Sequence, residues 1–275
     1  MKALRFYDVQ DLRYEDAPDP VIEKPDDVIV KVKAVGICGS DIARYRNLGP
    51  YVPGNVWGHE FCGEVVEVGE GVKNLKPGDR VVGCPNMVCH ECEYCKSGHP
   101  SRCENLNTIG AYVPGAYAEY IKLPEINFVK MADSMSYEQG ALVEPATVAI
   151  HGLYQTSIKM GYEVAVVGCG NIGLMAIAWA KAFGAKRVFA IDIDDAQLQL
   201  AKEFGADVLI NSTDIDFHDE IRKYGNGVDL AIESAGNPFT AARVLGLPHK
   251  GGEVVYMGIP YADVPIPRFY FERIM

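Results

Sequence analysis

The stretch Val164-Ala-Val-Val-Gly-Cys-Gly-Asn-Ile-Gly173 decides the fold of the second half of the chain. Four apolar residues are typical of a buried strand, and the pattern Gly-x-Gly-x-x-Gly then precedes a helical stretch that begins at Leu174. In this pattern Gly168 permits a tight turn, Gly170 lets the backbone approach a pyrophosphate, and Gly173 allows close packing of helix on strand. We therefore expect a strand–turn–helix unit that binds a dinucleotide.

The residues around this motif support the same interpretation. Asn171 and Ile172, inside the glycine pattern, are candidate cofactor-binding residues, because the free N–H groups and the dipole at the start of the following helix favour a phosphate. The next strand-like run ends in Asp192, 19 positions after Gly173. An acid there accepts hydrogen bonds from the ribose hydroxyls and repels a 2′-phosphate, so NAD is favoured over NADP. The alternative is a glycine turn and a solvated Asp in an α/β domain without a ligand.

The texture of the sequence changes near residue 145. Short β-type runs separated by Gly and Pro come before it, namely Asp27–Val35, 63–69 and Arg80–Gly83. Apolar strands alternate with amphipathic stretches after it, the strands being 164–167, 188–191, 208–210, 230–232 and 254–257 and the helical stretches 174–183 and 195–204. Such strands with helical crossovers indicate a parallel sheet covered on both faces.

We predict an α/β protein with two domains: an irregular, mainly-β domain at residues 1–145, and a doubly wound parallel sheet at 146–275. Helical residues around 137–154 are expected to join them. A six-strand dinucleotide domain needs one strand more than the five counted here. The chain, which stops at Phe271-Glu-Arg-Ile-Met275, is therefore expected to be C-terminally incomplete.

Composition excludes several classes of protein. The 275 residues are 48% hydrophobic and 23% charged, as in soluble globular proteins, and no window approaches the roughly 18 apolar residues of a membrane span. A net charge of −11 argues against nucleic acid as the main partner. There is no signal-peptide core, and the cysteines are clustered as in a metal site of a reducing compartment. The expected location is the cytoplasm.

Four of the eight cysteines fall within fifteen residues, at Cys89, Cys92, Cys95 and Cys103. Four thiolates so spaced (predicted lobe 84–104) can enclose Zn²⁺ in a tetrahedron without an open position, which predicts a structural metal. An iron–sulfur cluster and a redox CxxC are the alternatives, but the Pro of the ferredoxin run and the strand–CxxC–helix context are missing. The other cysteines considered (Cys62, Cys84 and Cys169) are expected to be small buried residues.

Three dispersed segments also carry metal-ligand residue types: Gly36-Ile-Cys38-Gly-Ser40-Asp41, Gly58-His59-Glu60 and Val143-Glu144-Pro145. Spacing alone does not unite them. Taken singly, Cys38 is more often a core thiol, His59 a histidine with ordinary hydrogen bonds, and Glu144 a solvated or helix-capping acid.

With these elements, the four-cysteine lobe and the late glycine pattern in order, the chain resembles the zinc-dependent medium-chain dehydrogenases over essentially its whole length. Within that family it is similar to the polyol branch, which includes sorbitol and galactitol-1-phosphate dehydrogenases. That branch has a Glu-Pro pair, found here as Glu144-Pro145, where branches resembling liver alcohol dehydrogenase have a Cys ligand. The resemblance implies a GroES-like catalytic domain and a Rossmann domain, two Zn²⁺ per chain, NAD, and assembly into homodimers or homotetramers.

By the same resemblance, Cys38, His59 and Glu144 would bind the catalytic zinc, and Glu60 would be an occasional ligand or a group behind the ligands. Asp41 would orient His59, and Ser40 would pass the proton of the alcohol outward. The implied activity is NAD-dependent oxidation of a secondary alcohol in a polyol or sugar-alcohol phosphate.

Arg44 stands where sorbitol dehydrogenases are expected to have an aromatic residue near substrate. It suits a phosphate, although a solvated surface Arg is an equally good interpretation. Two alternatives to the implied activity remain: a threonine or butanediol dehydrogenase, and a zinc- and NAD-binding fragment without turnover.

Overall fold

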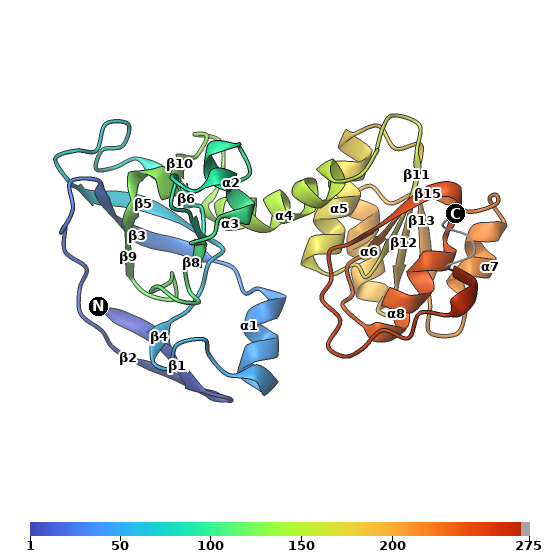
Figure 1. Cartoon of the computed structure of the whole chain (residues 1–275), viewed down its shortest axis with the longest axis horizontal. Helices are drawn as coiled ribbons and strands as arrows, with labels where there is room; N and C mark the ends of the chain where they lie inside the picture. Colours follow the sequence, from blue (N-terminus) through green and yellow to red (C-terminus); the bar gives the residue numbers. More distant parts are fainter. Residues whose placement is uncertain (271–275) are drawn as a thin grey trace. The chain divides into compact units, whose positions relative to one another are not determined.

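The computed structural model describes residues 1–270, so the predicted chain end at 271–275 lies outside the described part. The chain divides into two compact units, Met1–Glu144 and Pro145–Met275 (Figure 1). Helix α4 (Val143–Tyr154) begins in the first unit and continues in the second. Within residues 1–270, no helix has the length and apolar character needed to cross a bilayer.

The first unit is built from antiparallel sheets. A five-stranded sheet has the order β10-β6-β5-β3-β9 and a three-stranded sheet the order β2-β1-β4. The strands are β1 (Lys2–Asp8), β2 (Asp11–Asp16), β3 (Asp27–Val35), β4 (Asn55–Val56), β5 (Phe61–Val68), β6 (Arg80–Gly83), β9 (Tyr120–Pro124) and β10 (Phe128–Lys130). Alternate residues of the central strands, such as Val28 and Val30 of β3, pack with Phe61 and Val65 of β5 in one buried cluster.

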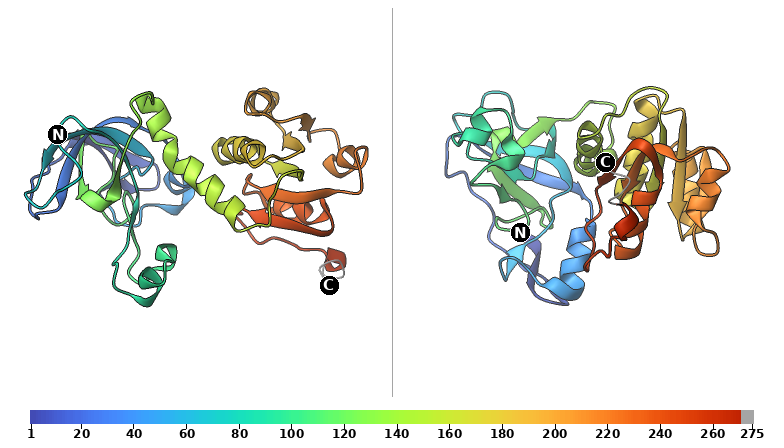
Figure 2. Two further views of the ribbon diagram at one scale, coloured as in Figure 1. Left: turned by 90° about the horizontal axis from the view of Figure 1, so that it is seen from above. Right: turned by 45° about the vertical axis from the view of Figure 1, so that its right-hand side comes forward.

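Short helices connect these strands. A turn of α-helix, α1 (Gly39–Ala43), and a π-helical turn, η1 (Arg44–Leu48), follow β3, whereas η3 (Glu125–Asn127) precedes β10 and α3 (Tyr137–Ala141) precedes α4. Between β6 and β9 lies a lobe that extends away from the sheet in the left view of Figure 2. It contains β7 (Asn86–Met87), α2 (Glu93–Lys96), η2 (Pro100–Arg102) and β8 (Asn107–Thr108).

The second unit holds five parallel strands in the order β13-β12-β11-β14-β15. They are β11 (Glu163–Val167), β12 (Arg187–Asp192), β13 (Val208–Asn211), β14 (Val228–Glu233) and β15 (Pro248–Tyr256). Successive residues of each strand face opposite sides, so one sheet supplies two clusters: Val164 and Val166 pack on one face, Ala165 and Val167 on the other.

Helices cover both faces of this sheet (Figure 1). Residues of α5 (Asn171–Ala182) and α6 (Asp195–Glu203) join the first cluster, and those of α7 (Phe217–Arg222) and η4 (Val244–Gly246) the second. The remaining helical elements are α8 (Pro238–Arg243) and η5 (Arg268–Tyr270). The α/β class and the parallel sheet predicted from the apolar runs are confirmed. The first four strands are one to three residues longer than those runs, whereas β15 begins six residues before its run and ends one residue before the end of that run.

Candidate metal centres and glycine-rich loop

The pairing of β3 with β5 brings two of the predicted ligand segments together. The antiparallel register sets Val35 opposite Phe61, so the chain leaving β3 meets the chain entering β5. The backbone N–H of Gly36 accordingly donates to the carbonyl of Glu60 at 2.7 Å. One donor atom each from Cys38, His59 and Glu60 then lie within 4.8 Å of one another.

The third predicted ligand arrives through α3. This helix packs directly on β5, because a Cβ on Gly140 would stand 2.8 Å from the Sγ of Cys62, which donates to the carbonyl of Tyr137 at 2.9 Å. Glu144 follows at the start of α4. Its carboxylate is not a member of the 4.8 Å group found among the described residues, but it is close enough for the charges of His59, Glu60 and Asp41 to act on it.

The acids of this cluster resist ionisation. Burial raises the pKa of the Cys38 thiol and of Glu60. Burial also raises the pKa of Glu144 to about 7; His59 opposes this rise, and the charges of Glu60 and Asp41 add to it. A thiol and several carboxyl groups that repel one another inside a protein are the donor set that a divalent cation stabilises. The cluster therefore fits a metal ion.

Asp41 lies behind His59 and not in the ligand group. Its Oδ2 accepts from the backbone N–H of Cys38 at 3.1 Å and from the Tyr117 hydroxyl at 2.7 Å, and its Oδ1 lies 3.8 Å from Nδ1 of His59. Ser40 is exposed on α1, and its hydroxyl and N–H groups lower the pKa of Cys38 against the effect of burial. Sequence reasoning missed Tyr117, which carries no motif and reaches Asp41 across 76 residues.

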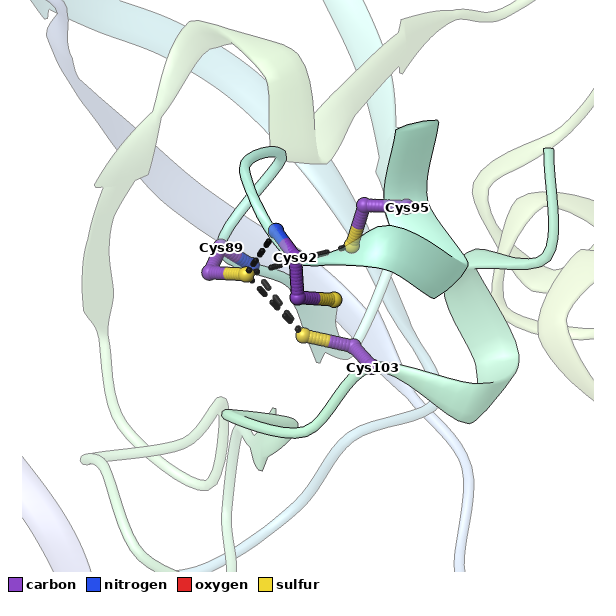
Figure 3. A group of neighbouring side chains, drawn as sticks. All are labelled: Cys89, Cys92, Cys95 and Cys103. Carbon is purple, nitrogen blue, oxygen red and sulfur yellow. Dashed lines mark hydrogen bonds between the residues drawn. The ribbon is translucent and has the colours of Figure 1, made fainter. Parts of the chain in front are cut away.

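The four cysteines of the lobe face a common point in Figure 3. Their sulfur atoms all lie within 4.8 Å of one another; Cys89 Sγ is 3.5 Å from Cys103 Sγ and 4.0 Å from Cys95 Sγ. Zn–S bonds of about 2.3 Å in a tetrahedron place sulfurs about 3.8 Å apart, so the spacing fits zinc. Backbone N–H groups of Cys92 and Asn105 point at Cys89 and Cys103, respectively, and stabilise thiolates there.

The charges in the lobe also suit a cation. Backbone N–H groups of Glu91 and Cys92 lower the pKa of Cys89 to about 6. Burial and the neighbouring thiols raise the pKa of Cys95 to about 12. Cys89 and Cys95 can therefore be thiolates together at neutral pH only when a positive charge offsets them. Of the other cysteines, Cys62 and Cys169 are buried as predicted, but the prediction for Cys84 is wrong: it is exposed, because it lies just past the end of β6.

In the glycine-rich loop of the second unit, the three glycines have different surroundings. Gly168 has a φ of +93°, and a Cβ there would meet the backbone nitrogen of Ala235 at 2.6 Å. A Cβ on Gly173 would meet the carbonyl oxygen of Gly168 at 1.9 Å. A Cβ on Gly170 would meet nothing within 4 Å, so this residue leaves open space at the N-terminus of α5. An open backbone at a helix N-terminus suits an anion.

Asp192 ends β12 beside this loop. Its Oδ2 accepts from the N–H of Cys169 at 2.6 Å, and its Oδ1 from the N–H groups of Ile193 and Asp194 at 2.7 and 3.0 Å. These bonds hold the carboxylate at the carboxyl end of the sheet, where open α/β sheets bind their ligands. Asn171 and Ile172 form the first turn of α5, which begins three residues before the predicted helical start at Leu174.

Arg44 begins η1, one turn after Ser40 on a nearly continuous helical stretch. Its Nη1 donates to the carbonyl of Gly49 at 3.0 Å, and its Cζ lies 3.3 Å from the centre of the Tyr51 ring. The side chain is half-buried. A guanidinium group has five N–H donors, of which the Gly49 bond uses one.

Comparison with known proteins gives consistent matches. Residues 24–133 match the alcohol dehydrogenase GroES-like domain, and residues 171–274 match the zinc-binding dehydrogenase domain. Sorbitol dehydrogenase of Bacillus subtilis is 39% identical over 94% of this chain and 75% of its own length. L-threonine 3-dehydrogenase of Caldanaerobacter subterraneus is 38% identical over 88% of this chain and 71% of its own. The solved structure of galactitol-1-phosphate dehydrogenase from Escherichia coli has a TM-score of 0.94 at 33% identity, covering 100% of this chain and 80% of that one.

Proposed function

The chain belongs to the zinc-dependent medium-chain dehydrogenases, and we propose that it oxidises a secondary alcohol of a polyol or sugar-alcohol phosphate, with NAD as the hydride acceptor. The observation that carries this proposal is the meeting of Cys38, His59 and Glu60 at one point, with Glu144 under the charge of the same cluster. A thiolate, an imidazole and a carboxylate are the ligands of catalytic zinc sites that keep one position open.

The residues of the first unit have separate roles in this scheme. Cys38, His59 and Glu144 hold the catalytic zinc, and Glu60 is near enough to replace a ligand. When bound, zinc supplies a Lewis acid that lowers the pKa of an alcohol hydroxyl, and NAD accepts the hydride. Ser40 takes the hydroxyl proton and passes it to solvent, for which its exposed position beside Cys38 is suitable. The second zinc is structural and is held by the four cysteines of the lobe.

The second unit binds the cofactor. Gly168, Gly170 and Gly173 shape the loop, and the N–H groups of Asn171 and Ile172 face the pyrophosphate. Asp192 accepts hydrogen bonds from the ribose hydroxyls. Its neighbours Asp194 and Asp195 add negative charge at the same turn, which supports a preference for NAD because a 2′-phosphate would be repelled.

Arg44 supports an anionic substrate. It lies one helical turn from Ser40, and its fork can donate two parallel hydrogen bonds to a phosphate while Tyr51 holds its plane. A threonine carboxylate could be bound in the same way, and the threonine dehydrogenase relative is nearly as similar as the sorbitol dehydrogenase. Substrate class therefore has to be decided by turnover.

The test is a panel of galactitol 1-phosphate, sorbitol, 2,3-butanediol and threonine, each assayed with NAD and with NADP, beside elemental analysis. We expect two zincs per chain and NAD reduction by a polyol or its phosphate. If the protein holds two zincs and binds NADH but oxidises none of the four, the alternative of a binding protein without turnover replaces the proposal. Turnover of threonine alone would replace it with an amino-acid dehydrogenase.

The variant Arg44→Met tests the anionic end of the substrate, and Arg46→Met, which removes an exposed charge from the same turn, is its control. Charged hydrogen bonds contribute about 1.5–3 kcal/mol, so KM for galactitol 1-phosphate should rise about 10- to 100-fold in Arg44→Met. KM for sorbitol should not change. Equal effects of the two variants on the phosphate ester would show that Arg44 does not bind it.

A further inference from the structure

The two oxygens of the Asp41 carboxylate have unlike surroundings. The residue is 7% exposed, and Oδ2 accepts two hydrogen bonds, from Cys38 N–H and from the Tyr117 hydroxyl. The other oxygen, Oδ1, is buried without a hydrogen-bond partner and lies 3.8 Å from Nδ1 of His59. A buried carboxylate oxygen that lacks a donor is costly, so a hydrogen bond from His59 Nδ1–H to Oδ1 would be favourable.

Tyr117 is held between the two ligand segments. Its backbone N–H donates to the carbonyl of Trp57 at 2.6 Å, and its hydroxyl is also 3.1 Å from the carbonyl of Gly36. Its ring lies so close to Gly58 that a Cβ there would be 2.4 Å from Cδ1. Gly58, with a φ of +95°, immediately precedes His59. The hydroxyl of Tyr117 is thus fixed by the same backbone that fixes Cys38 and His59.

We propose that Tyr117 is a positioning residue for the catalytic metal centre, acting through Asp41 on His59. The phenol is a donor at neutral pH and occupies Oδ2, which leaves Oδ1 as the acceptor for the Nδ1–H of His59. At 3.8 Å the two atoms are not yet hydrogen-bonded. Closing this distance when a metal binds would fix the imidazole as the tautomer with its lone pair on Nε2, and it would raise the basicity of that nitrogen toward the metal. Without the phenol, the carboxylate can rotate, because Oδ2 would be left with a single donor.

The variant Tyr117→Phe separates this role from packing, because it keeps the ring against Gly58 and removes only the hydroxyl. The control is Tyr7→Phe, which also removes a phenol–carboxylate bond in the first unit, the 2.5 Å bond to Glu15 on β2. Partners behind metal ligands typically contribute 10- to 100-fold to metal affinity. Since Tyr117 acts one step further out, we expect its loss to weaken the catalytic zinc about tenfold while the four-cysteine zinc is unchanged.

The measurement is zinc transfer to a competing chelator, with the visible spectrum of the cobalt-substituted protein as a second signal. Tyr117→Phe should release one zinc about tenfold more readily and shift the cobalt spectrum, and Tyr7→Phe should do neither. In an Asp41→Asn background the Tyr117→Phe change should have no further effect, since the path through Asp41 is already broken. Additive effects of the two changes would overturn the inference.

The inference rests on the proposed function, and the two can fail separately. A wild-type protein that binds one zinc, held by the four cysteines, would remove the catalytic zinc and with it the proposed function. A wild-type protein with two zincs whose release is unaltered by Tyr117→Phe would overturn the inference alone. If Tyr117→Phe does not fold, 3-fluorotyrosine at position 117 keeps the ring and makes the phenol a stronger donor. It should then tighten the catalytic zinc, and an unchanged or weaker site would contradict the role of the hydroxyl.

Discussion

Alanine at Gly173 should lower stability, whereas alanine at Gly170 should lower cofactor affinity and leave stability unchanged, although the two residues lie three apart in one loop. At Gly173 a new Cβ would stand 1.9 Å from the carbonyl oxygen of Gly168 and 3.0 Å from the Oγ of Ser234. Backbone atoms cannot move aside as a flexible side chain can. Overpacking typically costs about 1–3 kcal/mol, and a contact of 1.9 Å with a backbone oxygen belongs at the upper end of that range. The cost is then larger than the roughly 1 kcal/mol that Ala gains over Gly inside a helix.

At Gly170 the balance is different. The residue has a φ of −70°, which alanine adopts without strain, and a Cβ would have no neighbour within 4 Å. We therefore expect a change in unfolding free energy within about 0.5 kcal/mol. The methyl group would occupy the open space that the pyrophosphate needs, so NADH affinity should fall at least about tenfold, equivalent to about 1.4 kcal/mol.

Thermal unfolding and NADH fluorescence titration measure the two effects separately. At about 2–4 °C per kcal/mol, Gly173→Ala should lower Tm by several degrees, whereas Gly170→Ala should melt like the wild type. Gly225→Ala is a control in the same unit, because a Cβ there also meets nothing within 4 Å. Wild-type NADH affinity in Gly170→Ala would refute the assignment of this loop to the cofactor, and a wild-type Tm in Gly173→Ala would refute the close contact with Gly168.

Three further predictions concern other parts of the chain. Cys103→Ser should remove the four-cysteine zinc and lower Tm while NADH binding is retained, which elemental analysis and titration would show; two zincs in this variant would contradict the site. Burial raises the pKa of Asp216, but hydrogen bonds from Arg243 and His218 outweigh it and lower that pKa to about 2. The stability that this carboxylate contributes is therefore present above about pH 4 and is lost as pH falls toward 2. Between pH 5 and pH 3, the unfolding free energy measured in urea should fall less in Asp216→Asn than in the wild type. Glu233 is fully buried and accepts hydrogen bonds from the N–H groups of Ala235 and Gly236 and from the Thr240 hydroxyl. In Glu233→Gln an NH₂ group would face these donors, which should lower the unfolding free energy by about 1–3 kcal/mol. An unchanged Tm would show that the amide finds acceptors.

The parallel sheet could be predicted from the sequence because its strands are apolar on both faces. Val164–Val167 has no polar residue that would interrupt the pattern, and β11 extends it by one residue. The three-stranded sheet β2-β1-β4 was not predicted, for the opposite reason. Strands β1 and β2 carry charged residues along their length, and β4 has only two residues, too few to show a period. The four-cysteine site was visible because all its ligands fall within one short lobe.

The motifs alone did not show that Cys38, His59 and Glu60 lie close together. The distance between them in the sequence is not the reason, because the register of the β3–β5 pair is enough to bring them together. Once Val35 is known to pair with Phe61, Gly36 must lie beside Glu60, and Cys38 and His59 are then at most a few residues from the same point. Gly140 packs against Cys62 of β5, which places α3 beside that strand. Glu144, which follows α3, therefore lies near the same ligands. The alternation of β3 and β5 indicates two strands but not which residues face each other, and β-bulges shift the register twice along this pair. The information missing from the motifs was therefore the register of a single strand pair. Tyr117, which belongs to no motif, contacts the backbone of Trp57 and Gly58 just before the ligand His59, so its position near the ligands also depends on this backbone.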